Sequence, residues 1–206
     1  MTRGKFIVLE GPEGSGKTTQ IERLSARLVA EGLAPTVVRE PGGTRIGEAV
    51  RIVLLDAGNS RMTVGTELLL YMACRAQLVH EVIDPALDAG RAVLADRFLT
   101  STIVYQGIAG GMGSEGVKKL YRETCGETQP DLVVVLDVDA EAGLGRVTKE
   151  FDRMERKPLE FHRRVREGYL AVAGNDPDRY VVLDASRTVD EVAEAVWREV
   201  KRRVLS

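Results

Sequence analysis

Residues 11–18 read Gly-Pro-Glu-Gly-Ser-Gly-Lys-Thr and match the phosphate-binding pattern G-x-x-x-x-G-K-[ST]. The loop follows a short apolar run at 6–9, typical of a buried strand, and it precedes apolar residues at helical spacing from Ile21 to Val29. Glycines let such a loop wrap closely around an anion, and the N–H groups of the loop and of the helix start point inward. The pattern predicts that Lys17 reaches terminal phosphates and that the Thr18 hydroxyl binds Mg²⁺. The alternative is a glycine-rich turn that binds nothing.

Short apolar runs alternate with helical patterns along the whole chain. The runs lie at 6–9, 36–39, 92–95, 132–136 and 180–183. Helices are expected at about 18–32, 45–56, 64–89, 114–125, 140–149, 155–173 and 188–204. Continuously apolar strands are typical of sheets buried on both faces. The alternation predicts an α/β fold of the P-loop NTPase type, with a parallel sheet of at least five strands between layers of helices. Spacing does not define the strand order.

Composition places the chain among ordinary globular proteins. Its 206 residues fit one domain, and a net charge of −2 gives no overall attraction to nucleic acid or membrane. Because no apolar run approaches the roughly 18 residues of a membrane span, and the N-terminus does not resemble a signal peptide, a cytoplasmic protein is expected. Cys74, Cys125, His80 and His162 are isolated in the sequence, so they indicate free thiols and no metal cluster.

Polar residues follow two of the predicted strands at the edge where open α/β sheets bind ligands. Arg39 begins the turn 39–44, and its guanidinium would suit a phosphate or carboxylate; an exposed turn with a surface arginine is equally consistent. Asp96 would supply negative charge to a Mg²⁺ shell, and Arg97 would clamp a second phosphate group. A local Asp96–Arg97 ion pair is the alternative.

Two further segments carry residues suited to a nucleotide. Tyr71 and Arg75 share a helix face and could stack on a base and bind its edge, although a core tyrosine beside a snorkelling arginine fits this segment better by itself. The basic stretch 146–157 would close over a polyphosphate and exclude water, or it is a solvated charged helix.

Together these segments resemble the thymidylate kinase family over nearly the whole chain. The matching motifs are 10–19, 39–44, 96–98, 105–107 and 152–155, with Arg75, Gln77, Phe161, Arg166 and Tyr169 between and after them. The chain departs from the family pattern at three positions: Tyr71 stands for the usual Phe, Phe98 for a frequent Tyr, and Thr100 for a frequent Asp.

The resemblance implies transfer of a phosphoryl group from ATP to dTMP with Mg²⁺, in a homodimer that binds neither nucleic acid nor membrane. It implies a metal site at Thr18 and Asp96. It implies an ATP site formed by Gly11, Pro12, Glu13, Gly14, Ser15, Gly16, Lys17, Thr18, Thr19 and Arg146. It implies a dTMP site formed by Glu13, Arg39, Pro41, Tyr71, Arg75, Arg97, Ser101, Thr102, Tyr105 and Gln106.

The family divides by the place of its catalytic cation, which lies either in the phosphate loop or in a basic lid. The loop of this chain has no arginine, so it resembles the bacterial-like type with a lid at about 146–158. Catalytic roles are implied for Lys17, Arg97, Arg153 and Lys149, with Arg153 as the leading lid cation.

Three other functions fit the phosphate loop. One is a kinase for another nucleoside monophosphate or a small alcohol. Another is a switch or motor driven by ATP or GTP, although the Asn-Lys-x-Asp motif for guanine is missing. The third is a nucleotide-binding subunit without catalysis, which the presence of Lys17, Thr18, Asp96 and Arg97 argues against.

Overall fold

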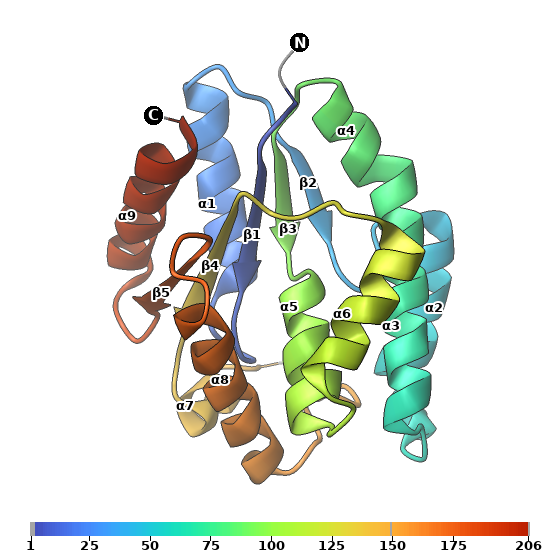
Figure 1. The fold of residues 1–206 in the computed structure, drawn as a ribbon. Helices are drawn as coiled ribbons and strands as arrows, with labels where there is room; N and C mark the ends of the chain where they lie inside the picture. The colour runs from blue at the N-terminus through green and yellow to red at the C-terminus, as the bar shows by residue number, and fades with distance from the viewer. Residues whose placement is uncertain (1–2, 149, 206) are drawn as a thin grey trace.

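The computed structural model describes residues 3–148 and 150–205, and its centre is one parallel five-stranded sheet (Figure 1). The strands are β1 Phe6–Glu10, β2 Thr36–Arg39, β3 Val93–Asp96, β4 Leu132–Asp137 and β5 Tyr180–Asp184. Their order is β2-β3-β1-β4-β5, and every pair is parallel. The predicted strands and their parallel arrangement are confirmed, with ends that differ by one residue at most.

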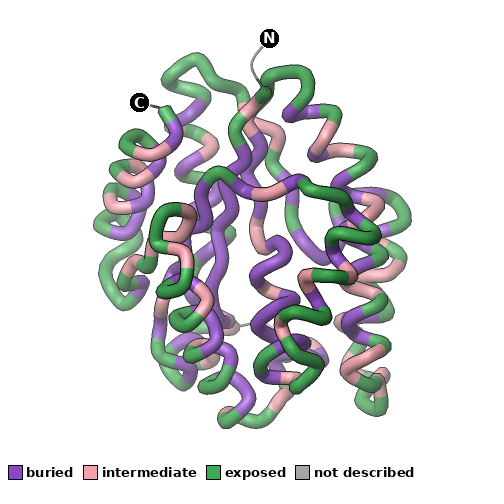
Figure 2. The backbone as a smooth tube through the Cα atoms, viewed as in Figure 1, coloured by how far each residue is buried: buried purple, intermediate pink, exposed green. Residues whose placement is uncertain are grey.

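Helices cover both faces of the sheet and give the three predicted layers (Figures 1 and 2). Phe6 and Val8 of β1 point into one apolar core, whereas Ile7 and Leu9 point into the other, because successive strand residues face opposite sides. The second core is closed by α1 Lys17–Ala30 and α9 Val189–Val200. The first is closed by α3 Val64–Leu78, α4 Asp84–Asp88, α5 Leu99–Thr102, α6 Ser114–Cys125 and α8 Leu159–Gly174.

Two shorter connections complete the fold. The helix α2 Arg45–Leu55 packs on α3, and α7 Ala140–Gly145 follows β4 and contacts α8. The predicted helix 64–89 is confirmed as one helical stretch in which a π-helical turn, Val79–Ile83, joins α3 to α4. Among the described residues, no helix is both long and apolar enough to cross a membrane.

Two helix boundaries differ by four residues from the prediction, and one helical segment was not predicted. The helix expected at 155–173 begins only at Leu159, because Pro158 precedes it in extended conformation. The helix expected at 140–149 ends at Gly145. A helical segment that was not predicted runs through α5 and continues as the π-helical stretch Ile103–Ala109. Its β-branched residues favour strands locally, but packing between α6 and α8 makes it helical.

Candidate active site

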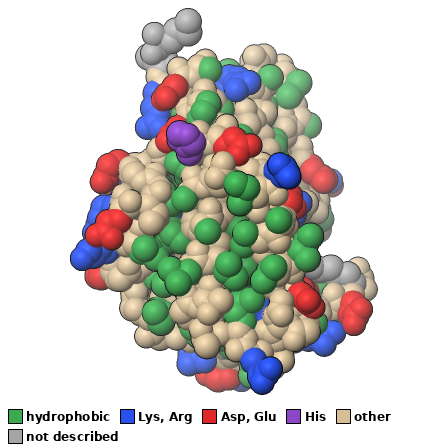
Figure 3. All heavy atoms as spheres, turned by 90° about the vertical axis from the view of Figure 1, so that its right-hand side faces the viewer, with side chains coloured by type: hydrophobic (Ala, Val, Ile, Leu, Met, Phe, Trp, Pro, Cys, Tyr) green, Lys and Arg blue, Asp and Glu red, His purple; other side chains and the backbone are tan. Residues whose placement is uncertain are grey.

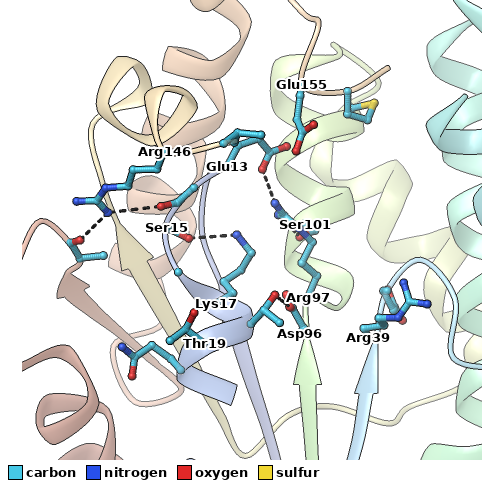
Figure 4. A pocket seen from close by; sticks show the side chains of 18 of the residues that line it. Glu13, Ser15, Lys17, Thr19, Arg39, Asp96, Arg97, Ser101, Arg146 and Glu155 are labelled. Atoms are coloured by element: carbon cyan, nitrogen blue, oxygen red, sulfur yellow. Dashed lines mark hydrogen bonds and ion pairs between the residues drawn. The ribbon is translucent and has the colours of Figure 1, made fainter. Parts of the chain in front are cut away.

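A cavity of about 1060 Å³ opens at the carboxyl edge of the sheet. Its wall includes the phosphate loop, the ends of β2 and β3, one face of α3, the first turns after Arg97, and parts of the segment 146–155 (Figure 4). Parallel strands place their following loops at one edge, which explains why residues far apart in sequence meet here. Nearly every predicted binding residue lines this cavity: Glu13, Gly14, Ser15, Gly16, Lys17, Thr18, Thr19, Arg39, Pro41, Tyr71, Arg75, Asp96, Arg97, Ser101, Thr102, Tyr105, Gln106 and Arg146.

The phosphate loop is closed around the ammonium of Lys17. Lys17 Nζ donates to the carbonyl oxygens of Gly11 (3.1 Å) and Pro12 (2.8 Å) and to Ser15 Oγ (3.1 Å). Gly14 has φ +66°, and a Cβ at this position would lie 1.9 Å from the carbonyl oxygen of Gly143. Only glycine therefore fits where the loop meets α7. Gly11 and Pro12 contribute carbonyls that hold Lys17 and do not line the cavity.

Burial and the nearby charge of Arg97 lower the pKa of Lys17 to about 8, although Glu13 and Asp96 act in the opposite direction. Above about pH 8 the free protein therefore loses this proton, whereas bound triphosphate would hold it in place. Once ATP is fully ionised, we expect its affinity to stay constant up to about pH 8 and then to fall by about tenfold per pH unit. Calorimetry at pH 9 in two buffers of different ionisation enthalpy should detect proton uptake on ATP binding. Equal heats in the two buffers would contradict this.

Thr18 and Asp96 lie together beside the loop. Thr18 Oγ1 donates to Asp96 Oδ2 at 2.8 Å, which joins the first turn of α1 to the end of β3. A hydroxyl and a carboxylate are hard oxygen ligands of the kind that Mg²⁺ takes together with phosphate oxygens and water. Within the described ranges, no group of three or more His, Cys, Asp and Glu residues is arranged to hold a metal.

Several partners hold the side chain of Arg97 in the cavity. Its guanidinium forms an ion pair with Glu13 and donates to the carbonyl oxygen of Gly11 at 3.0 Å, and it lies 5.3 Å from the ring centre of Tyr105. The Tyr105 hydroxyl also donates to Glu13, at 2.8 Å. Burial by itself would lower the pKa of Arg97, but Tyr105 and Glu13 outweigh it, and Arg97 stays charged. The ion pair is therefore made with Glu13 rather than with the adjacent Asp96.

Arg75 is buried at the inner end of the cavity and is no snorkelling surface residue. Its guanidinium binds both carboxylate oxygens of Glu40, donates to the carbonyl oxygen of Phe98 at 3.0 Å, and is 1% exposed. Tyr71 lies on the same face of α3 and lines the cavity with Arg75. A planar ring and a fixed guanidinium thus form the wall where the resemblance implies a base.

Arg51 is a cavity residue that the sequence did not reveal. It lies on α2, donates to the carbonyl oxygen of Pro41 at 2.7 Å, and burial together with the charge of Arg39 lowers its pKa. Arg39 itself is half-exposed and binds both oxygens of Glu48 at 2.9 Å each. The sequence did contain a signal for Arg51: in the predicted helix 45–56 it lies three residues from Glu48 and therefore on the same face.

Arg153, the leading lid cation, is not brought to the cavity. Its neighbours Asp152, Met154 and Glu155 line the wall, whereas Arg153 is 5% exposed and forms an ion pair with Glu67 of α3. Its Nε donates to the carbonyl oxygen of Leu54 at 2.7 Å. The predicted second cation, Lys149, lies outside the described residues. Arg146 lines the cavity and donates to the carbonyl oxygen of Ala185 at 3.0 Å.

Glu67 gathers several donors behind the cavity wall. Besides Arg153 it accepts from Lys157 Nζ at 3.1 Å and from Gln106 Nε2 at 3.2 Å. Arg153→Ala removes one of the two cations that pair with the buried Glu67 and leaves Lys157, so it should lower the free energy of unfolding by about 3 kcal/mol, the lower end of the range for a broken buried ion pair. In urea unfolding, Arg153→Ala combined with Glu67→Gln should cost less than the sum of the single variants. The exposed Arg163→Ala variant is the control. Full additivity would refute the coupling.

The sheet order, the loop leading into α1, and the hydroxyl–carboxylate pair beside it define a P-loop protein that handles nucleoside phosphates. The family model described as thymidylate kinase matches residues 9–196. The thymidylate kinase of Deinococcus radiodurans is 48% identical over 205 residues, covering 98% of this chain and 99% of the relative. That of Geobacter sulfurreducens is 46% identical over 209 residues, covering 98% of each.

A solved structure agrees with the sequence matches. The crystal structure of thymidylate kinase from Ehrlichia chaffeensis superposes with a TM-score of 0.80 at 30% identity, covering 97% of this chain and 99% of the other. The chain belongs to the thymidylate kinase family.

Proposed function

We propose that this protein is a thymidylate kinase that transfers the γ-phosphoryl group of ATP to dTMP, producing dTDP and ADP for the synthesis of dTTP. The match of the family model over residues 9–196 carries this conclusion. The cavity supports it, because it runs continuously from the phosphate loop to a pocket with an aromatic ring and several arginines.

The two ends of the cavity suit the two nucleotides. Lys17 and the loop amides would hold the ATP phosphates, and Arg146 would lie against adenine. Arg97 and Arg39 would bind the phosphate of dTMP, with Arg51 beside them. Tyr71 and Arg75 would contact the base, with Thr102 in the same pocket, and Pro41, Ser101 and Gln106 would complete the dTMP site. Tyr105 would lie beside the sugar, and Glu13 would lie near its 3′-hydroxyl or near the metal.

Thr18 and Asp96 would hold Mg²⁺, and their 2.8 Å contact fits this role because it brings a hydroxyl and a carboxylate oxygen together beside the loop. Bound Mg²⁺ would neutralise charge on the phosphate oxygens. The acceptor oxygen of dTMP is already an anion, so no strong general base is needed. Catalysis then consists of aligning the two phosphates and stabilising their charge. We assign residues 146–158 to a lid of this single domain, which would keep water from the transferred group.

A coupled ADP-release assay with ATP, Mg²⁺ and each nucleoside monophosphate tests the proposal. We expect strong turnover with dTMP, weaker turnover with dUMP, negligible turnover with AMP or CMP, and little ATP hydrolysis without an acceptor. A preference for another acceptor would indicate a different kinase. ADP release that is independent of any acceptor would indicate a switch or motor. Nucleotide binding without turnover would indicate a non-catalytic subunit.

We also propose a cytoplasmic location, since Cys74 and Cys125 are free thiols.

We further propose a homodimer formed through α2 and α3. Apolar side chains gather on this face (Figure 3), and Ile46, Ile52 and Val53 of α2 and Leu69 of α3 are exposed. Exposed apolar residues on adjacent helices are typical of a protein–protein interface. Sedimentation should give twice the chain mass, and Ile52→Glu with Leu69→Glu should shift it toward the monomer. Val29→Glu, at an exposed position of α1, is the control. An unchanged dimer in the double variant would place the interface elsewhere.

A further inference from the structure

Glu10, the last residue of β1, is a buried carboxylate with four donors. Its side chain has no exposed surface. Its Oε1 accepts from the backbone N–H groups of Phe98 (2.9 Å) and Ser101 (3.1 Å). Its Oε2 accepts from Ser101 Oγ (2.6 Å) and from the hydroxyl of Tyr169 on α8 (3.0 Å). Because a carboxylate offers about four acceptor positions, this set uses its full capacity. Glu10 itself does not line the cavity.

The two hydroxyls that bind Glu10 also bind Arg97. Arg97 Nη1 donates to Ser101 Oγ at 3.1 Å and to the Tyr169 hydroxyl at 3.0 Å, and the two hydroxyl oxygens are 2.8 Å apart. Each hydroxyl has one proton. Because the Glu10 carboxylate can only accept, the Ser101 hydroxyl proton points to Glu10, and the Tyr169 hydroxyl proton points to Glu10 or to Ser101. The lone pairs of both hydroxyl oxygens are then available to accept from Arg97. An amide in place of the carboxylate would donate and reverse this order.

The hydrogen bonds from backbone N–H groups to Glu10 also hold the chain around Arg97. Arg97 has φ +70°, a left-handed conformation that is unfavourable for a side chain of this size. Such a conformation is strained and persists only where neighbouring groups hold it. The N–H groups of Phe98 and Ser101, which follow Arg97 in the chain, are both bound by Glu10, and the N–H of Arg97 binds the carbonyl oxygen of Leu9 at 3.0 Å.

We propose that Glu10 and Tyr169 are positioning residues that fix the guanidinium of Arg97 toward the phosphate of the acceptor nucleotide, with Ser101 relaying the hydrogen bonds. This proposal rests on the proposed function, in which Arg97 binds that phosphate. It also gives Ser101 a different part from direct contact with the nucleotide. The ion pair with Glu13 restrains one side of the Arg97 guanidinium, and the Glu10 network restrains the other.

The test compares three variants in steady-state kinetics. Glu10→Gln keeps the side-chain size and one acceptor oxygen, and Tyr169→Phe removes one hydroxyl. Hydrogen bonds that involve a charged group are worth about tenfold to a hundredfold, so we expect losses of that size in kcat/KM for dTMP, with KM for ATP within about twofold. Tyr180→Phe is the matched control, because its hydroxyl binds Thr100 Oγ1 at 2.9 Å on the same helix, next to Ser101. We expect it to change kcat/KM less than about twofold.

A double-mutant cycle with Arg97→Met separates positioning from general structure. If Glu10 and Tyr169 act through Arg97, their substitutions should change kcat/KM for dTMP by less than about twofold in the Arg97→Met background. Persistence of the full loss in that background, or a Tyr180→Phe loss as large as that of Tyr169→Phe, would overturn the proposal. Tyr169→Phe carries the test by itself if Glu10→Gln does not fold. Absence of dTMP turnover in the unaltered protein would instead refute the proposed function.

Discussion

Replacing Lys17 by methionine should reduce kcat with saturating ATP and dTMP by about a thousandfold, the upper range for loss of one preorganised donor to a developing charge. Lys17 is the loop's own cation, and its Nζ lies among the Gly11 and Pro12 carbonyls and Ser15 Oγ. Methionine keeps the length and apolar stem of lysine but removes the charge. The variant therefore loses electrostatic stabilisation of the phosphoryl oxygens and keeps the packing of the side chain.

Stability should not fall in the same variant. Burial lowers the pKa of Lys17 to about 8, below its unfolded value near 10.4, so the folded state disfavours the charged form at neutral pH. By the same linkage, this group should make the unaltered protein more stable as pH rises from about 8 to 10, because the unfolded chain binds more protons there. Urea unfolding of Lys17→Met, and of the unaltered protein between about pH 8 and 10, checks these two expectations. Lys5→Met, at a half-exposed lysine paired with Asp131, is the control. A kcat within tenfold of the unaltered enzyme would remove Lys17 from the catalytic set.

Replacing Arg97 by methionine should lower kcat/KM for dTMP by about a hundredfold to a thousandfold and leave KM for ATP within severalfold. The guanidinium is held between Glu13 and the Ser101 and Tyr169 hydroxyls, so its fork is fixed before substrate arrives. Lysine at this position would keep the charge without the planar fork, and Arg97→Lys should recover only part of the activity.

Loss of Arg97 also leaves Glu13 without its ion-pair partner, so stability and activity must be measured together. Steady-state kinetics with varied dTMP should be paired with urea unfolding at the same temperature, and Arg163→Met on the exposed side of α8 is the control. A KM for ATP that rises as much as the KM for dTMP would indicate a general structural defect. An unchanged KM and kcat for dTMP would exclude Arg97 from the acceptor site.

Local patterns predicted the parts of the site that are continuous in the chain. The loop 11–18, the turn at Arg39 and the Asp96–Arg97 pair each follow a strand, so their place at the carboxyl edge followed from the fold class. The helix after Arg97 was not predicted, because residues 99–109 are rich in β-branched side chains and carry Gly107. Packing of α6 and α8 on either side determines its conformation.

Contacts between residues far apart in the chain distinguish what the sequence could predict from what only the tertiary structure determines. The sequence by itself determined the α/β class, the phosphate loop and most of the cavity wall, since strand periodicity and a glycine-rich loop are local properties. It could not determine that Arg153 binds Glu67, 86 positions away, or that Tyr169 reaches Glu10, 159 positions away. The tertiary structure decided these pairings. A buried arginine or carboxylate must find a partner, and only the packing of the helices on the sheet brings one within reach.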